Sequence, residues 1–205
     1  MKYVWFGRRI IVPFIFAAML IAASGSFAQL KLNDVTLKTL MKTKITGLDK
    51  ETSFEQKEEK AIDTIKEGQS EACTLTVTLR NREMQEADVQ LEWYILSKHM
   101  TGKVQNGRQE EPVRGVFQAG KKKISLDAGA TVTEAIEPKP LVLIKITKNT
   151  LNESTGNQHT MITEKGDAYL GYLVLVTVDG EIIDKEASSY PYEQDEWIEK
   201  CRNSR

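Results

Sequence analysis

Cysteine and histidine are scarce in this 205-residue sequence, which contains two of each. No CxxC or HxxxH pair occurs, and His99 and His159 lie far in the sequence from Cys73 and Cys201. A zinc site is therefore not expected, and two histidines give little capacity for general-base catalysis. The sequence also lacks a nucleophile-elbow or zinc-protease motif. We therefore expect no catalytic residue, no metal, no cofactor and no enzymatic activity.

A large excess of either charge is also missing. The first 28 residues hold three of the 28 basic residues and none of the 29 acidic ones, so residues 29–205 carry 25 basic against 29 acidic residues. Nucleic-acid binders usually show a strong basic excess, so we do not expect a nucleic-acid partner. The length of 29–205 is typical of a single domain with its own core.

The N-terminus has the three parts of a secretory signal. Basic residues precede a strongly apolar run at 10–23, and Ser26-Phe27-Ala28 places small residues three and one before a cleavage point at Gln29. The apolar run is shorter than the roughly 20 residues of a membrane span. We predict a signal peptide at 1–28, Sec-type export to the periplasm, the cell surface or the medium, and no transmembrane segment after cleavage. The alternative is an uncleaved N-terminal anchor.

The two cysteines allow one disulfide in an exported chain, between Cys73 and Cys201. An oxidising compartment favours the bond, and no other cysteine competes for either partner. The alternative is that each cysteine is a small buried hydrophobe.

Alternation of apolar and polar residues dominates from residue 72 onward. It predicts half-buried strands at 72–80 and 89–95, because successive side chains of a strand point to opposite faces. By this parity Trp93 faces the core. The run 168–178 is rich in Tyr, Leu and Val, and Asp179-Gly180 after it predicts a two-residue hairpin turn.

The other segments give weaker patterns. We expect a first strand at 35–45, short strands at 123–126 and 131–136, and a strand at 141–146 that is apolar on both faces and therefore covered on both sides. Residues 98–120 are polar and glycine-rich, and we interpret them as a long connection with one short strand at 114–119. The pattern at 51–67 is compatible with either a helix or a strand. We expect a short helix at 192–201.

These elements predict an all-β fold, an immunoglobulin-like antiparallel β-sandwich of about seven strands. A short C-terminal helix and an ambiguous N-terminal segment complete a single domain at 29–205. The segments CTLTVTLRN, ADVQLEWYI, ISLDAG and GYLVLVTVDGEI resemble those of bacterial exported immunoglobulin-like or fibronectin type III-like domains. The resemblance implies an extracytoplasmic module, but the chain lacks the tandem repeats of an adhesive array.

Two groups of side chains are candidate binding residues. A basic segment over 98–123 could attract anionic polysaccharide, lipid headgroups or nucleic acid, although a simple solvated segment is the alternative. Its members are Lys98, Lys103, Arg108, Arg114, Lys121, Lys122 and Lys123. Aromatic residues in the strands and at the C-terminus could form a sugar platform, although aromatics on strands more often pack in the core.

The sequence thus favours an exported, non-catalytic envelope protein that acts as a structural or protein-interaction module. The alternative is a carbohydrate- or glycan-binding accessory module. A surface cluster of aromatics would favour the glycan function, and a deep pocket with converging titratable groups would favour an enzyme.

Overall fold

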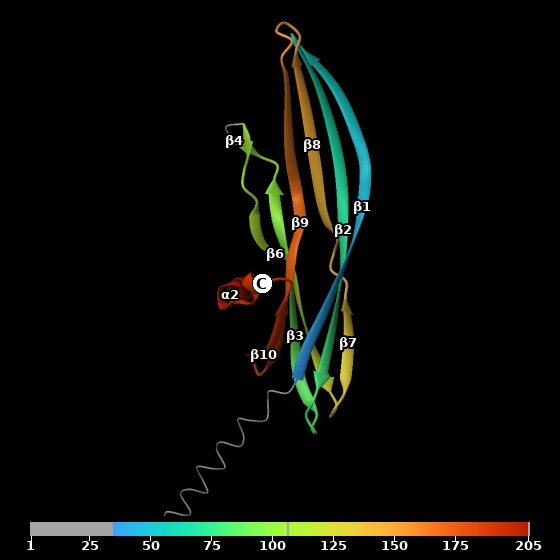
Figure 1. Cartoon of the computed structure of the whole chain (residues 1–205), viewed down its shortest axis with the longest axis vertical. Helices are drawn as coiled ribbons and strands as arrows, with labels where there is room; N and C mark the ends of the chain where they lie inside the picture. The colour runs from blue at the N-terminus through green and yellow to red at the C-terminus, as the bar shows by residue number, and fades with distance from the viewer. Residues whose placement is uncertain (1–34, 106, 205) are drawn as a thin grey trace, which may run out of the picture.

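The computed structural model describes residues 35–105 and 107–204, so the predicted signal peptide at 1–28 lies outside the described residues. The described chain is all-β, and its strands pair antiparallel. The strands are β1 (Val35–Lys57), β2 (Lys60–Asn81), β3 (Ala87–Thr101), β4 (Val104–Gln105), β5 (Arg108–Gln109), β6 (Val113–Leu126), β7 (Thr131–Ile136), β8 (Leu141–Asn152), β9 (Gln158–Val178) and β10 (Glu181–Ala187). A 3₁₀ turn η1 (Tyr190–Glu193) and a helix α2 (Asp195–Asn203) follow. A layered body lies at one end of the molecule and a long arm at the other (Figure 1).

The body forms because one sheet folds over on itself. Its two parts, β1–β2–β7 and β10–β9–β3–β6, contribute alternate apolar side chains to one shared core. Leu75, Val77 and Leu79 of β2 are fully buried there, as are Val174 and Val176 of β9. The sequence alternation at 72–80 therefore predicts both the strand and its buried face correctly.

A second cluster lies on the other side of β3 and β9. Tyr94, Leu96, Leu173 and Leu175 point away from the first core and are covered by η1 and α2. Ile198 and Cys201 are the buried residues of α2. The predicted C-terminal helix is therefore present, and it forms a third layer over the β3–β9 part of the body (Figure 1).

Side chains close the two seams of the body. On one side Leu37 and Thr39 of β1 donate their backbone N–H groups to carboxylates of β10, at 2.8 Å from Asp184 and 2.7 Å from Glu186. On the other side the Lys122 ammonium of β6 lies 2.7 Å from the Glu134 carboxylate of β7. The seams are therefore held by charged side chains and not by a backbone ladder.

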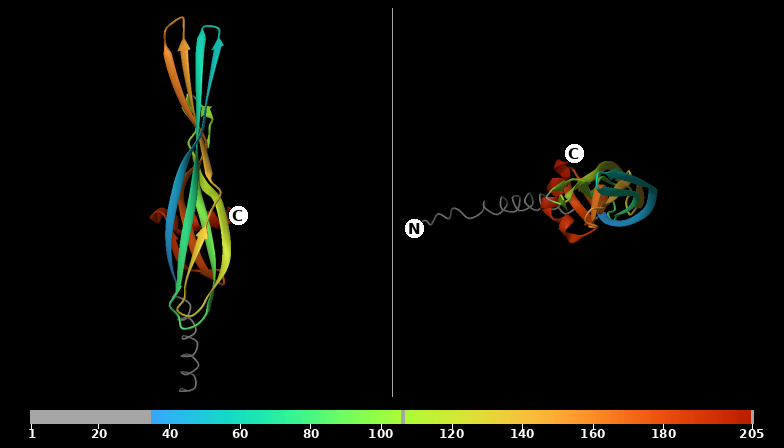
Figure 2. Two further views of the ribbon diagram at one scale, coloured as in Figure 1. Left: turned by 90° about the vertical axis from the view of Figure 1, so that its right-hand side faces the viewer. Right: turned by 90° about the horizontal axis from the view of Figure 1, so that it is seen from above.

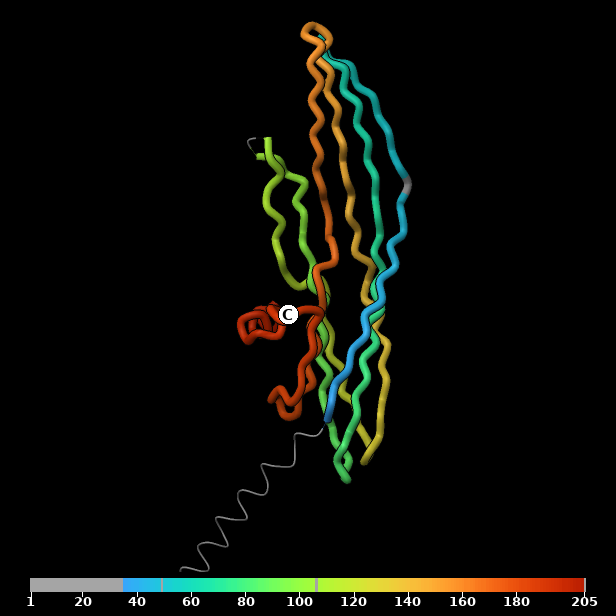
Figure 3. The backbone as a smooth tube through the Cα atoms, in the orientation of Figure 1, coloured from blue at the N-terminus to red at the C-terminus, as the bar shows by residue number. Residues whose placement is uncertain are grey.

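Four strand segments continue beyond the body as the arm, which we define as 50–57 of β1, 60–71 of β2, 141–152 of β8 and 158–166 of β9. Figure 2 shows these segments as a twisted single layer. The two hairpin tips lie together (Figure 3), and the Glu153 N–H donates to the Glu59 carbonyl across 2.8 Å. The segment 51–67, for which helix and strand were open, is therefore the β1–β2 hairpin.

Two expectations are wrong. The segment 98–120 is no long connection, because β3 runs on to Thr101, a small β4–β5 hairpin follows, and β6 is continuous over Val113–Leu126. Gly107 does lie in the β4–β5 turn, but Gly115 and Gly120 lie within β6, where Gly120 is opposite Trp93 in the ladder. The strand at 141–146 is not covered on both sides, since Val142 is 40% exposed and Ile144 is 36% exposed in the arm.

Other local predictions are confirmed. β7 spans Thr131–Ile136, as predicted, and β1 includes the expected first strand. Asp179 and Gly180 form the β9–β10 turn with φ of 51° and 87°. Both lie in the left-handed region that an Asp-Gly hairpin turn requires.

Candidate functional site

The predicted basic segment does not form a loop. Lys98 and Arg114 are ladder partners on β3 and β6, and Lys103 and Arg108 belong to the β4–β5 region. The three lysines at 121–123 lie far along β6 with alternating orientation. The Lys122 ammonium is paired with the Glu134 carboxylate. The seven side chains are spread over β3, the β4–β5 region and β6, and they do not converge on one site. Lysines on an edge strand also discourage sheet-to-sheet aggregation, which accounts for this composition.

The predicted disulfide between Cys73 and Cys201 is not formed. Cys73 is in the core between the two parts of the body, and Cys201 is in the cluster under α2. The β3–β9 layer separates these clusters, which prevents the approach that a disulfide needs. The expectation failed because sequence parity cannot show which side of a sheet the terminal helix covers. Burial, and secondarily the Glu71 carboxylate, raise the pKa of the Cys73 thiol to about 11.

The aromatic residues proposed as a sugar platform are mostly packed inside. Tyr94, Tyr172 and Tyr192 are buried, and the Tyr192 and Trp197 rings meet edge to face at 5.2 Å. Burial is also the main cause that raises the pKa of Tyr169. Tyr190 is the exposed member of this group, at 74%, so most of these rings pack inside and one faces outward.

Trp93 lies on the predicted face, next to the core, but it is only partly buried. Its indole covers Gly120, where an added Cβ would overlap the ring atoms. The register prediction is confirmed, and the burial of the Trp93 side chain is incomplete because β6 is the edge strand of the sheet.

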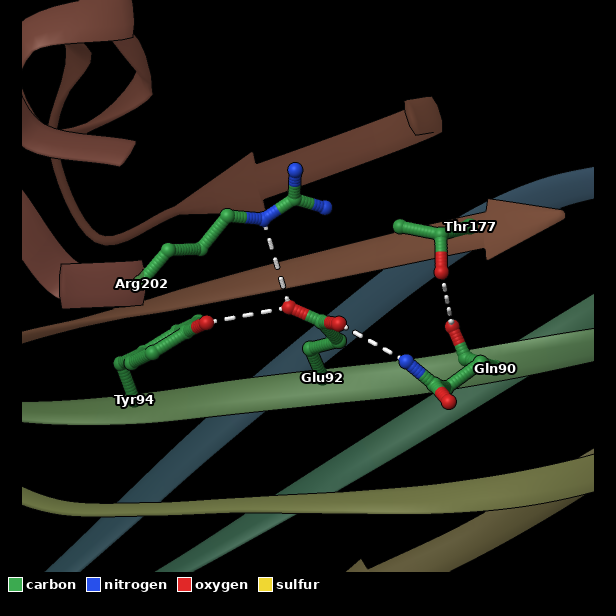
Figure 4. A network of polar contacts seen from close by, with 5 residues as sticks. All are labelled: Gln90, Glu92, Tyr94, Thr177 and Arg202. Atoms are coloured by element: carbon green, nitrogen blue, oxygen red, sulfur yellow. Dashed lines mark hydrogen bonds and ion pairs between the residues drawn. The ribbon is translucent and has the colours of Figure 1, made fainter. Parts of the chain in front are cut away.

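A buried carboxylate joins the body to α2 (Figure 4). Glu92, whose side chain is 7% exposed, accepts hydrogen bonds from Gln90 Nε2 at 2.8 Å and from the Tyr94 hydroxyl at 3.0 Å. Arg202 Nε of α2 lies 3.5 Å from the same carboxylate. Sequence parity places Glu92 on the face opposite Trp93, but nothing in the sequence shows that a helix covers that face. Because the carboxylate is enclosed by these donors, the network holds α2 in place and is no open reaction site.

The side chains that most resemble a catalytic site lie at the C-terminal end of β3. Ser97, His99 and Asp167 line a cavity of about 390 Å³ together with Phe117 and Val113. Ser97 Oγ donates to Asp167 Oδ1 at 3.1 Å, and His99 Nδ1 lies 3.2 Å from the same oxygen. In a nucleophilic triad the histidine must accept the serine proton, so these two contacts do not activate the serine.

A larger hollow of about 630 Å³ lies at the opposite end of the body, by the β9–β10 turn. Its polar groups include Asp88 and Ser125, and the Ser125 hydroxyl lies within donating distance of two carboxylates, 2.6 Å from Asp88 Oδ1 and 2.7 Å from Glu86 Oε1. The described residues contain no cluster of three or more metal-ligating groups. No helix in the described chain is long and apolar enough to span a membrane.

No protein-family model matches the sequence, and the search of curated proteins finds no relative. Several solved structures are similar to the chain at low TM-scores. A β-glucuronidase of Bacteroides uniformis is 17% identical over 70% of this chain and 15% of its own, with a TM-score of 0.22. A protein from Akkermansia muciniphila is 9% identical over 77% of this chain and 76% of its own, with a TM-score of 0.23. The putative ApaA protein from Bordetella pertussis is 15% identical over 64% of this chain and 93% of its own, with a TM-score of 0.20. Scores this low carry no inference about fold family or activity.

Proposed function

We propose that the protein is an exported, non-catalytic envelope protein that acts as a protein-interaction module through its arm. The observation that carries this proposal is the exposure of both faces of the arm. Residues 51–60 are exposed throughout, and the arm's apolar side chains belong to neither buried cluster, apart from Leu141 at its base. A single-layer sheet with open faces and long edges is a surface that a partner can cover.

One side of the arm combines exposed apolar and polar groups, as protein interfaces do. The ladder registers place Phe54, Leu151 and Ile162 on this side, where they are 68%, 42% and 51% exposed. Asn149 and Thr160 lie between them, and Asn149 Oδ1 accepts from Thr160 Oγ1 at 2.9 Å. We name this surface the arm face. Large aliphatic and aromatic side chains exposed together are typical of a binding surface.

The proposal also includes export of the protein and an immunoglobulin-like fold of the body. The signal at 1–28 supports export to the periplasm or cell surface, and detection of a mature N-terminus at Gln29 by mass spectrometry tests it. The seven strands of the body support an immunoglobulin-like sandwich, from which the four arm segments extend.

Site-specific photocrosslinking in the native host tests the interaction. A photoreactive phenylalanine analogue replaces Phe54 in the full chain, and the same analogue replaces Lys121, which is exposed on β6 far from the arm face. We expect one discrete cross-linked species from position 54 and none from position 121. The double variant Phe54→Glu with Ile162→Glu should abolish cross-linking from Leu151 without changing the far-UV circular dichroism spectrum.

The mass of the adduct identifies the type of partner. An adduct of twice the protein mass identifies a second copy, and another discrete mass identifies a different protein; both support an interaction module. Equal labelling from positions 54 and 121, or no adduct from 54, 151 and 162, overturns the proposal.

A further inference from the structure

The outer face of the body, on the side of β1, β2 and β7, has an unusual composition. In these strands one set of alternate side chains points into the core, so the other set points outward. Ladder partners share a face, which makes the outward set continuous across three strands. We name it the threonine–lysine face. Its members are Thr36, Lys38, Leu40, Lys42 and Lys44 of β1, Ala72, Thr74, Thr76, Thr78 and Arg80 of β2, and Thr131, Thr133 and Ala135 of β7.

Every charged member of this face is basic, although residues 29–205 carry more acidic than basic residues. Carboxylates lie at its borders and not among its members, and Glu137 directly follows the last residue of β7. Asp184 and Glu186 meet the outer edge of β1, where they accept backbone N–H groups, and Glu51 lies farther along β1 beside Lys66 at 3.6 Å. The members of the face thus include four basic side chains and no carboxylate, a charge pattern that is complementary to an anionic partner.

The neutral members of the face are chiefly hydroxyls in a regular array. Threonines recur about 7 Å apart along a strand and about 5 Å apart between strands, as sheet geometry dictates. The Oγ1 atoms of Thr78 and Thr133 are 3.4 Å apart. Neighbouring hydroxyls are therefore close enough to contact each other and the same ligand. Each hydroxyl can donate and accept, which suits a ligand that itself carries many hydroxyl groups.

We propose that the threonine–lysine face binds an acidic polysaccharide, with its carboxylate or sulfate groups on the lysines and its hydroxyls on the threonines. A membrane surface fits less well because stable attachment needs inserted apolar groups, and Leu40, 55% exposed, is the one large apolar side chain on the face. A single-stranded nucleic acid fits less well because the face has no aromatic ring for stacking. The inference goes beyond the protein-interaction function and uses a different surface from the arm face.

Titration calorimetry with the full-length protein tests the proposal. The probes are polygalacturonate and a sulfated dextran, compared with neutral dextran and with anionic phosphatidylglycerol vesicles. We expect binding to the charged polysaccharides that weakens as salt rises, and none to neutral dextran. The triple variant Lys38→Glu, Lys42→Glu, Lys44→Glu should weaken polysaccharide binding at least about tenfold.

A second triple variant with the same change in net charge serves as the control. Lys103→Glu, Lys121→Glu and Lys123→Glu make the same charge change in the basic segment of β6 and its hairpin, and affinity should change less than about twofold. Thr74→Val with Thr76→Val removes hydroxyls at constant charge and shape, and should weaken polysaccharide binding but not its salt dependence. Thermal unfolding confirms that each variant folds.

Three results would overturn the proposal: no binding to either charged polysaccharide, equal loss in the two triple variants, or tighter binding to the vesicles than to the polysaccharides. None of these results affects cross-linking from the arm face, so failure of this inference is distinguishable from failure of the proposed function.

Discussion

Arg202 of α2 and Glu92 of β3 lie 3.5 Å apart, and this contact joins the last turn of the C-terminal helix to the body (Figure 4). Glu92 also accepts from Tyr94 and Gln90, so three donors surround one nearly buried carboxylate. Among the described side chains, no buried nitrogen or oxygen lacks a hydrogen-bond partner. A buried charge with several partners costs far less than an isolated one, which explains how an acidic residue is accommodated in this layer.

Replacing Glu92 with alanine should destabilise the protein by about 2–3 kcal/mol, because hydrogen bonds to a buried charged group are lost. Urea unfolding measures the change. Glu134→Ala is the matched control: it removes a carboxylate from the more exposed pair with Lys122, whose contribution is about 0–1 kcal/mol. Equal effects of the two substitutions would show that Glu92 has no special role.

Gly120→Ala should destabilise the protein by about 1–3 kcal/mol, because the new methyl group would displace the Trp93 indole. Gly115→Ala on the same strand is the control, since nothing lies within 4 Å of a Cβ at that position. The control should be neutral or slightly stabilising, as the backbone of the unfolded chain becomes less flexible. Urea unfolding monitored by circular dichroism compares the two variants, and a neutral Gly120→Ala contradicts the packing argument.

Local patterns predicted much of the body because the physical cause is local. The alternation around Leu75 and Val77 reports one buried face of a strand, and Asp179-Gly180 supplies the positive φ of a hairpin turn. The Trp93 register followed from the same period of two. Each of these features depends on residues within a few positions in the sequence.

The arm and the sites depend on partners far apart in the sequence. The apolar run that includes Ile144 predicts a buried strand. Ile144 is instead exposed, because no second layer covers the arm. The position of Asp184 against the edge of β1, and of Arg202 against Glu92, follows from the folding over of the whole sheet. The threonine–lysine face arises only when three strands distant in the sequence are paired in register.

The carboxylates of β10 should protect two amides of β1 from hydrogen exchange. Substituting Asp184 and Glu186 with alanine removes the acceptors of the Leu37 and Thr39 N–H groups, so those amides should exchange faster and stability should fall by about 1–3 kcal/mol. Amide exchange measured by NMR follows each position. Glu181→Ala, at an exposed position on the same strand, should leave both amides unchanged. Unchanged protection in the double variant would mean that the seam does not depend on these bonds.

The two cysteines should remain reduced even after export, because the β3–β9 layer lies between them. Non-reducing mass spectrometry should find two thiols that iodoacetamide alkylates in denaturant, with little reaction in the native protein at pH 8. The single variants Cys73→Ser and Cys201→Ser should each lose one alkylation site and form no dimer through the other. A mass two hydrogens lower in the native protein, restored by reductant, would demonstrate the disulfide.

The Cys73 thiol should also make stability depend on pH in alkaline solution. Its pKa is raised from 9.0 to about 11 on folding, so the folded state binds its proton more tightly than the unfolded state does. The contribution is complete below pH 9 and is lost as pH rises from 9 towards 11, with a slope of at most about 1.4 kcal/mol per pH unit. Urea unfolding between pH 9 and 10 should therefore show a flatter decline for Cys73→Ala than for the native chain. Parallel declines would show that the folded thiol ionises as readily as the unfolded one.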